Sequence, residues 1–283
     1  MMKIVHLTDT HLVAEGLNLY GLDPRARLDA AVADINRHHG DAEVVVITGD
    51  LTHWGEPEAY ASLVDSLAPL HPPVIPLLGN HDDRAAFQIA FPGALEDAGG
   101  FVQGRRETAA GTLLFLDTNQ PGTAAGWYCE ERLAWLEREL AALPSPAFIF
   151  MHHPPFDVGI AEMDRIGLTQ AAAFRAAIEP HAGKIRHLFY GHVHRPICGS
   201  WLGIPTSTLR GTNHQVWLDF AAGDESLSFS YEEPAYAVVL VDETRVVIHS
   251  HDYLYDRGTY AARIGASAEK ERAYALGFDA AAE

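Results

Sequence analysis

Cysteine is scarce in this sequence, which has only Cys129 and Cys198 among its 283 residues. Two cysteines are too few for a disulfide framework, so we expect both to be free thiols. Long apolar runs are absent as well, and none approaches the roughly 20 residues that a membrane-spanning helix needs. The N-terminal stretch MMKIVHLTDTHL lacks the long apolar core and small-residue cleavage site of a signal peptide. We therefore expect a cytoplasmic protein that does not bind a membrane.

Positive charge is also in short supply, because 20 Lys and Arg face 38 Asp and Glu, for a net charge of −18. A protein that tracks long nucleic acid needs a basic groove, so this balance argues against such a partner. An anionic substrate would need a concentrated positive charge inside an acidic protein, and bound metal ions are one way to supply it.

Short apolar runs dominate the first two hundred residues and alternate with helical patterns. The runs predict strands buried on both faces at 3–7, 43–48, 74–78, 112–116, 147–151 and 187–190. Apolar residues at helical spacing predict helices at 26–38, 56–68, 130–143 and 169–182, the last capped by Thr169. This alternation predicts an α/β fold.

After about residue 198 the sequence predicts consecutive strands at 203–209, 214–220, 226–232, 236–241 and 245–251, with little helix between them. We expect a single domain over 1–283, in which 199–255 contributes a second sheet, a cap or an oligomerisation segment. The tail 252–283, with Tyr255, Tyr260 and Tyr274, fits either a helix or a partner-binding arm.

Carboxylate, imidazole and amide groups follow five of the predicted strands. These groups are Asp9-Thr10-His11, Gly49-Asp50, Gly79-Asn80-His81-Asp82, His152-His153-Pro154-Pro155 and Gly191-His192-Val193-His194. In α/β sheets the carboxyl ends of the strands face the ligand crevice, so all five are expected at one edge. Asp, Asn and His together suit Mn, Fe, Co or Zn, and Asp50 is the natural carboxylate to bridge two ions. Each pattern alone also fits a cap, a turn or a structural strand end, but the five together indicate a metal or catalytic site.

Other histidines lie outside these patterns. We expect His38, His39, His71, His181 and His187 to be solvated.

The ordered motifs D-x-H, GD, GNHD, H and GHxH, spanning residues 9 to 194, resemble those of the calcineurin-like metallophosphoesterase superfamily. The resemblance implies a two-sheet β-sandwich flanked by helices (αββα) and a site for two divalent metal ions. One ion is then held by Asp9, His11, Asp50 and His194, and the other by Asp50, Asn80, His152 and His192, with Asp50 bridging. His81 faces the substrate without ligating, and His153 is not a ligand.

Longer stretches point to a branch of this superfamily. LYGLDPRARLDAAV, GDLTHWGEPEAY, GNHDDRAAF and MHHPPFDVGIAEMD resemble bacterial class III cyclic nucleotide phosphodiesterases and glycerophosphodiesterases, and LRGTNHQV resembles the latter. The resemblance implies hydrolysis of small phosphodiesters by in-line attack of a hydroxide held between the metals, with glycerophosphodiesters slightly preferred over cyclic nucleotides. The GDxxDRG motif of protein phosphatases is missing. The first alternative is a phosphodiesterase specific for 3′,5′- or 2′,3′-cyclic nucleotides, the next is a phosphomonoesterase or nuclease, and the last is a non-catalytic scaffold.

The same resemblance suggests roles for single residues. Asp50 and His81 are the expected catalytic residues, and His81 is placed to protonate the leaving oxygen or to hold the phosphoryl group. Asn80, His81, Tyr20, Asn119 and His214 are the expected substrate-binding residues, and the alternative role for Asn119 is to hold a ligand histidine. Because relatives are often dimers or larger, we expect a homo-oligomer.

Overall fold

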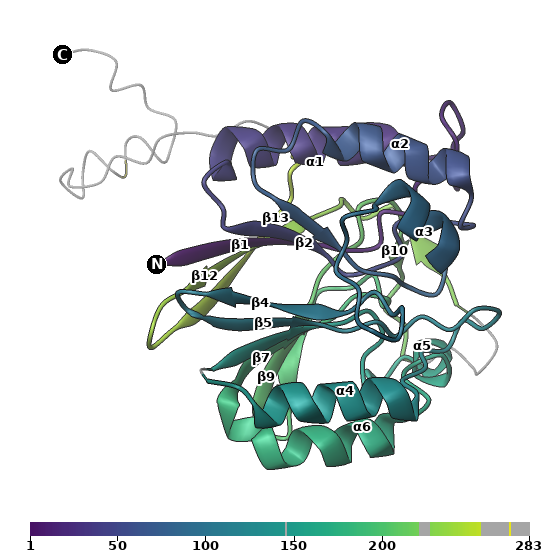
Figure 1. The fold of residues 1–283 in the computed structure, drawn as a ribbon. Coiled ribbons are helices and arrows are strands. Elements are labelled where there is room, and N and C mark those ends of the chain that lie inside the picture. Colours follow the sequence, from purple (N-terminus) through teal and green to yellow (C-terminus); the bar gives the residue numbers. More distant parts are fainter. Residues whose placement is uncertain (145, 221–226, 256–271, 273–283) are drawn as a thin grey trace.

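Two β-sheets stacked face to face form the centre of the protein, and helices cover both outer faces (Figure 1). The structure is a computed structural model that describes residues 1–144, 146–220, 227–255 and 272. The first sheet has the order β13 (Val246–His251), β12 (Tyr236–Val241), β1 (Met2–Leu7), β2 (Val44–Ile47) and β3 (Val74–Pro76). The second has the order β4 (Gly104–Thr108), β5 (Gly111–Phe115), β6 (Ala147–Phe150), β7 (Ile185–Phe189), β9 (Ile204–Thr208) and β8 (Ile197–Trp201).

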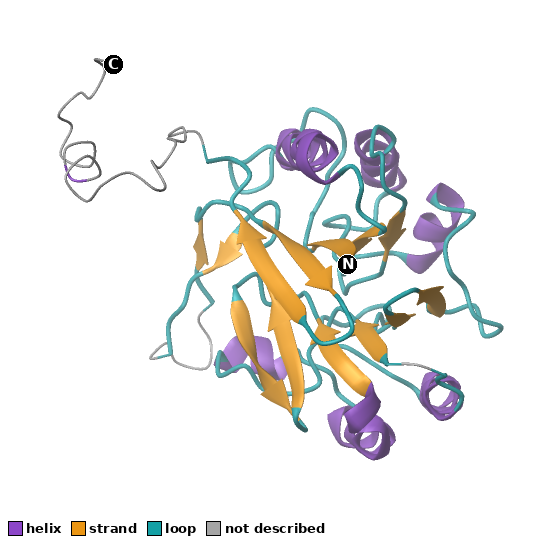
Figure 2. Ribbon diagram, turned by 90° about the vertical axis from the view of Figure 1, so that its left-hand side faces the viewer, coloured by secondary structure: helices purple, strands orange, loops and turns teal. Residues whose placement is uncertain are grey.

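The helices complete a four-layer αββα arrangement. Helices α1 (Pro24–His39), α2 (Pro57–Leu67) and α3 (Arg84–Ala90) lie beside the first sheet, and α4 (Glu130–Ala141) and α6 (Ala171–Ile178) lie beside the second. The short helices α5 (Ala161–Arg165) and η1 (Glu179–Lys184) flank α6 in the chain. Figure 2 shows both sheets between the helical layers. The predicted fold class is therefore confirmed.

Apolar side chains point alternately to the two faces of each central strand, so each sheet packs against the other sheet on one face and against helices on the other. On β2, Val44 and Val46 face the core between the sheets, whereas Val45 and Ile47 face α1 and α2. On β6, Phe148 and Phe150 face the inter-sheet core, where Phe150 stacks on Phe189 at 4.6 Å between ring centroids. A strand buried on both faces reads as a continuous apolar run, which is why the sequence located these strands.

Strand direction brings the site together. β1, β2 and β3 run parallel to one another, and so do β5, β6 and β7. The loops that follow their carboxyl ends therefore meet at one edge of the sandwich.

The C-terminal strands do not form a sheet of their own, contrary to one expectation for 199–255. β12 pairs antiparallel with β1 and extends the first sheet, while β9 pairs parallel with β7 and extends the second. Within the described part of this segment, only β10 (Gln215–Val216) and β11 (Phe229–Ser230) form a separate two-stranded ribbon. The single domain, the cap and the oligomer interface stay predictions.

Smaller differences have physical reasons. α6 begins after Gln170, and no side chain caps it, so the predicted Thr169 cap is wrong. His187 is buried on β7, where its Nε2 lies 2.8 Å from Ser207 Oγ, so the prediction that it is solvated is also wrong. Cys129 and Cys198 are free, as predicted. No helix in the described part of the chain is long and apolar enough to cross a membrane. Tyr260 and Tyr274 of the tail lie outside the described residues.

Candidate metal centre

Loops after five parallel strands bring the seven expected metal ligands to one place. These residues are Asp9, His11, Asp50, Asn80, His152, His192 and His194; all are buried except Asn80, which is half-buried. The first four come from loops of the first sheet and the last three from loops of the second. The site therefore spans the seam between the two sheets.

One group of four closely spaced side chains matches the first expected ligand set. The donor atoms of Asp9, His11, Asp50 and His194 all lie within 4.8 Å of one another. His194 Nε2 is 3.2 Å from Asp9 Oδ1, and His11 Nε2 is 3.6 Å from Asp50 Oδ2. Two carboxylates and two imidazoles at this spacing suit a divalent transition metal.

The second expected set lies on the other side of Asp50. His152 Nε2 is 3.3 Å from Asp50 Oδ2 and 3.2 Å from Asn80 Oδ1. Among the described residues, none forms a hydrogen bond with the buried Nε2 of His192. A buried polar atom of this kind normally has a partner, and a metal ion would supply one. Because Asp50 Oδ2 faces both His11 and His152, it fits a bridging position.

Main-chain oxygens orient two of the imidazoles. His152 Nδ1 donates to Thr48 O at 2.7 Å, and His194 Nδ1 donates to His214 O at 2.8 Å. The ring proton is thereby placed on Nδ1, and the Nε2 lone pair is directed into the site, as in other histidine metal sites. His11 differs, because its Nδ1 lies 3.0 Å from Nδ1 of another side chain, His53.

The electrostatics of the cluster favour a bound cation. Burial opposes ionisation of Asp9, but the charge and hydrogen bond of His194 hold the pKa of Asp9 below its usual value. Burial lowers the pKa of His152, but the charge and hydrogen bond of Asp50, the charge of Asp9 and the hydrogen bond to Thr48 O together raise that pKa to about 9. The carboxylates therefore attract positive charge to this buried spot. The residues present fit a site for divalent metal ions.

Backbone strain is concentrated at the same residues. Seven described non-glycine residues have positive φ, and five of them are proposed ligands: Asp9 (52°), His11 (45°), Asp50 (49°), His192 (70°) and His194 (47°). Non-glycine residues adopt this region only where the surrounding structure imposes it, and such residues cluster at functional sites. The backbone of Gly79 also lies too close to the site for a side chain, because a Cβ there would come 2.2 Å from Asp50 Oδ1.

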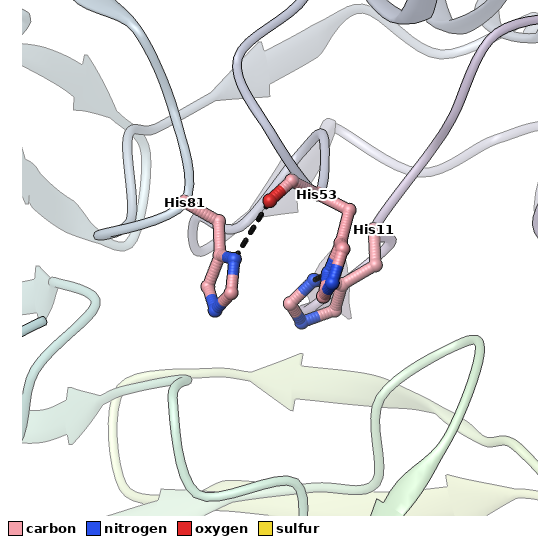
Figure 3. Close-up of side chains that lie close together, drawn as sticks. All are labelled: His11, His53 and His81. Carbon is pink, nitrogen blue, oxygen red and sulfur yellow. Dashed lines mark hydrogen bonds between the residues drawn. The ribbon is translucent and has the colours of Figure 1, made fainter. Parts of the chain in front are cut away.

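His81 stands beside the ligands at the edge of a cavity. Its main-chain N–H donates to Asp50 Oδ1 at 2.9 Å. Its Nδ1 donates to His53 O at 2.8 Å, as Figure 3 shows. Among the described residues, none forms a hydrogen bond with His81 Nε2. The cavity, of about 130 Å³, is lined by His81, ligand residues, Tyr20 and His214, and its outer wall includes Met163, Ile166 and Phe229. Larger hollows between α2 and α3 and at the opposite end of the sheets contain no ligand residue.

Asn119 lies behind the ligand loop and does not line this cavity. Its side-chain Nδ2 donates to Gly79 O at 2.7 Å and to Asp82 O at 3.0 Å. Asn119 therefore braces the loop that carries Asn80 and His81, which differs from its expected place beside the substrate. Both ring nitrogens of His153 already have hydrogen-bond partners, Thr118 Oγ1 at 2.7 Å and Ala124 O at 3.2 Å, so His153 is not a proposed ligand.

Sequence reasoning missed two residues of the site, His53 and Asp82. The buried Asp82 carboxylate accepts from the main-chain N–H groups of Leu51 and Gly79 at 3.0 and 2.9 Å, and so joins two ligand loops. Burial and the charge of Asp50 raise the pKa of Asp82 to about 6, against these hydrogen bonds. Asp82 belongs to the GNHD motif and His53 to the stretch GDLTHWGEPEAY, three residues after Asp50, but only the folded chain shows that Asp82 joins two loops and that His53 meets His11.

Sequence comparison identifies the family of this protein. Residues 2–196 match the family model of the calcineurin-like phosphoesterases, and the chain belongs to that family. It is 48% identical over 259 residues to a probable cyclic nucleotide phosphodiesterase of Rhodopseudomonas palustris, covering 90% of this chain and 94% of that protein. It is 33% identical over 220 residues to the glycerophosphodiester phosphodiesterase GpdQ of Enterobacter lignolyticus, covering 76% of this chain and 79% of that protein.

A solved structure shares the fold at low sequence identity. A purple acid phosphatase from yellow lupin superposes with a TM-score of 0.66 at 14% identity, over 89% of this chain and 51% of that one.

Proposed function

We propose that this protein is a phosphodiesterase that uses two divalent metal ions to hydrolyse small phosphodiesters. The observation that carries the proposal is the buried cluster of two carboxylates and four imidazoles, with Asp50 between two ligand groups. Bound there, two divalent ions would neutralise charge on the phosphoryl oxygens and lower the pKa of water. Asp9, His11, Asp50 and His194 would hold one ion, and Asp50, Asn80, His152 and His192 the other.

The cavity wall favours a diester over a monoester. Within the described part of the chain, neither Lys nor Arg lines the cavity. A phosphodiester carries one negative charge, whereas a monoester carries close to two near neutral pH. Without basic side chains, positive charge at this site comes from the ions alone, so the singly charged substrate is the better match.

Aromatic side chains at the mouth favour an organic group with a flat face. Tyr20 stacks on Phe229 at 5.6 Å with an interplanar angle of 18°, and Tyr20 meets His214 edge to face at 4.8 Å. A nucleobase gains from stacking on such a surface. This surface and the 48% identity to a probable cyclic nucleotide phosphodiesterase support our proposal of cyclic nucleotides ahead of glycerophosphodiesters, the reverse of the order that the sequence favoured.

His81 would act on the leaving group. Its Nδ1–H is committed to His53 O, so Nε2 is the atom that remains for the substrate. A proton given from Nε2 to the departing oxygen would avoid a free alkoxide. The main-chain hydrogen bond from His81 to Asp50 keeps this ring beside the proposed bridging carboxylate.

A rate comparison tests the proposal. The purified protein is stripped of metal, reloaded with Mn²⁺ and given an aryl phosphodiester, its monoester, 3′,5′-cyclic AMP, 2′,3′-cyclic AMP and glycerophosphocholine. We expect metal-dependent diester hydrolysis well above monoester hydrolysis, with a cyclic nucleotide cleaved fastest among the natural substrates. Monoester turnover above diester turnover would indicate a phosphomonoesterase, and the absence of metal-dependent turnover would contradict the proposal.

A further inference from the structure

His53 is a buried histidine, only 8% exposed, that contacts two residues of the proposed site (Figure 3). Its Nδ1 lies 3.0 Å from His11 Nδ1. Its ring stacks on the ring of His81 at 4.7 Å with an interplanar angle of 19°, and its main-chain oxygen accepts from His81 Nδ1. One residue thus touches both a proposed metal ligand and the proposed proton donor.

The contact with His11 fixes where the protons lie. Two facing Nδ1 atoms can share only one proton, since one must donate and the other accept. His11 Nε2 is the atom that faces Asp50 and His194, at 3.6 and 3.1 Å. A ligating nitrogen carries no proton, so the proton of His11 belongs on Nδ1. His53 Nδ1 is then the acceptor, and His53 carries its own proton on Nε2.

This arrangement differs from that of the other oriented ligands. His152 and His194 donate to main-chain oxygens, which no side-chain substitution removes. His11 depends instead on a side chain that belongs to no ligand motif. The partner of a metal-bound histidine typically affects metal affinity 10- to 100-fold.

We propose that His53 is a positioning residue, whose Nδ1 sets the tautomer of His11 for metal binding and whose ring holds His81 in place. This inference rests on the proposed metal site. His53 acts through His11 and His81, so its two contacts have separable consequences. Loss of the Nδ1 acceptor weakens metal binding, and loss of the ring loosens His81.

Another arrangement would place a third cation among His11, His53 and His81, whose donor nitrogens lie within 4.8 Å of one another. The existing contacts favour the positioning role. His81 Nδ1 already donates to a main-chain oxygen, and His11 Nε2 faces the carboxylates. Metal stoichiometry distinguishes the two arrangements.

Paired variants separate the two contacts of His53. His53→Asn loses the ring but keeps an acceptor near the position of Nδ1. His53→Leu has nearly the same shape as His53→Asn but lacks the acceptor. His53→Phe keeps a ring and lacks the acceptor. Metal-free protein is titrated with Mn²⁺ in a calorimeter. We expect His53→Phe and His53→Leu to lose 10- to 100-fold in affinity at one of two sites, and His53→Asn to stay within about threefold of the wild type. If His53→Phe does not fold, the Asn and Leu pair carries the comparison.

Turnover gives the second readout. At saturating Mn²⁺ we expect His53→Phe to keep most of the wild-type kcat, because its ring still supports His81, and His53→Asn to lose about tenfold in kcat with little change in KM. His38→Phe is the matched control: it makes the same substitution at a histidine of α1 whose side chain is 50% exposed and does not line the cavity, and it should bind Mn²⁺ as the wild type does.

Several results would overturn the proposal. These are wild-type affinity in both His53→Phe and His53→Leu, equal losses in all three His53 variants, a loss in His38→Phe, or a third ion that disappears with His53. Calorimetry does not depend on turnover, so a wild type that binds two ions without cleaving any diester would refute the proposed function alone.

Discussion

The carboxylate of Asp9 accepts a hydrogen bond from the main-chain N–H of His192, 183 residues away in the chain, at 3.2 Å. Asp9 follows β1 of the first sheet and His192 follows β7 of the second, so this bond joins the two sheets at the site. Bound metal would join them more strongly, because each proposed ion takes ligands from both sheets.

Metal should therefore stabilise the whole fold. At a free ion concentration 100 times Kd, binding to the native state alone adds about 2.7 kcal/mol to the free energy of unfolding. For a chain of this size we expect Tm to rise by roughly 5–10 °C when Mn²⁺ is added to metal-free protein. Differential scanning calorimetry with and without EDTA measures the change. An unchanged Tm would mean that Mn²⁺ does not bind the native state in preference to the unfolded chain.

Asp50→Ala should lose at least one of the two ions, because Asp50 Oδ2 faces both ligand groups. Elemental analysis after dialysis against Mn²⁺ gives the stoichiometry, and Asp65→Ala, on α2, is the control. Retention of two ions by Asp50→Ala would contradict the bridging role.

His81→Ala should lower kcat by roughly 10²- to 10⁴-fold, the usual contribution of a positioned proton donor, while metal content stays near two ions. An aryl diester with a very acidic phenol needs little protonation on leaving, so the loss should be smaller for that substrate. Depletion of metal in this variant would instead make His81 a ligand.

Phe229→Ala removes the ring on which Tyr20 stacks, and we expect it to raise KM for a cyclic nucleotide roughly tenfold. KM for an alkyl diester without an aromatic group should change less. Phe220→Ala is the matched control, because Phe220 is 71% exposed and does not line the cavity. Unchanged substrate ranking would remove Phe229 and Tyr20 from the binding surface.

Acid should destabilise the inter-sheet core through His187. Burial lowers the pKa of His187 to about 4, whereas the unfolded chain has an ordinary value near 6.5. Between these values the unfolded state binds a proton that the native state does not, so the free energy of unfolding falls as pH falls from about 6.5 to 4, by up to ~1.4 kcal/mol per pH unit. Urea unfolding of the metal-free protein at several pH values should show a shallower decline for His187→Phe. An identical decline in both proteins would show that His187 does not contribute.

The sequence predicted the central strands and the ligand loops because both depend on local patterns. Strands buried on two faces leave continuous apolar runs, and motif residues follow their ends. The sequence did not predict the edge strands β4 and β8, because GRRET and ICGSW are largely exposed and form no continuous apolar run. The partners of β9 and β12 depend on pairing between distant segments, which no local pattern encodes.

The same distinction applies within the site. Asp9, His11 and Asp50 stand in motifs, so their proximity followed from strand order alone. His53 meets His11 across 42 residues of sequence, and Asn119 reaches Gly79 across 40. Such contacts depend on side-chain direction in the folded loops. This is why Asn119 was expected at the substrate and His53 was not expected at all.

Five of the proposed ligands have a left-handed backbone conformation, so stability and activity make opposite demands on the same residues of this protein. Each such residue costs roughly 1–2 kcal/mol compared with a glycine at the same position. Replacing these residues with glycine would therefore relieve the backbone strain while removing the side chains that we propose bind metal. Selection for thermal stability alone, without a demand for turnover, should favour replacement of the proposed ligands. The first replacements are expected in the loops where the two sheets meet.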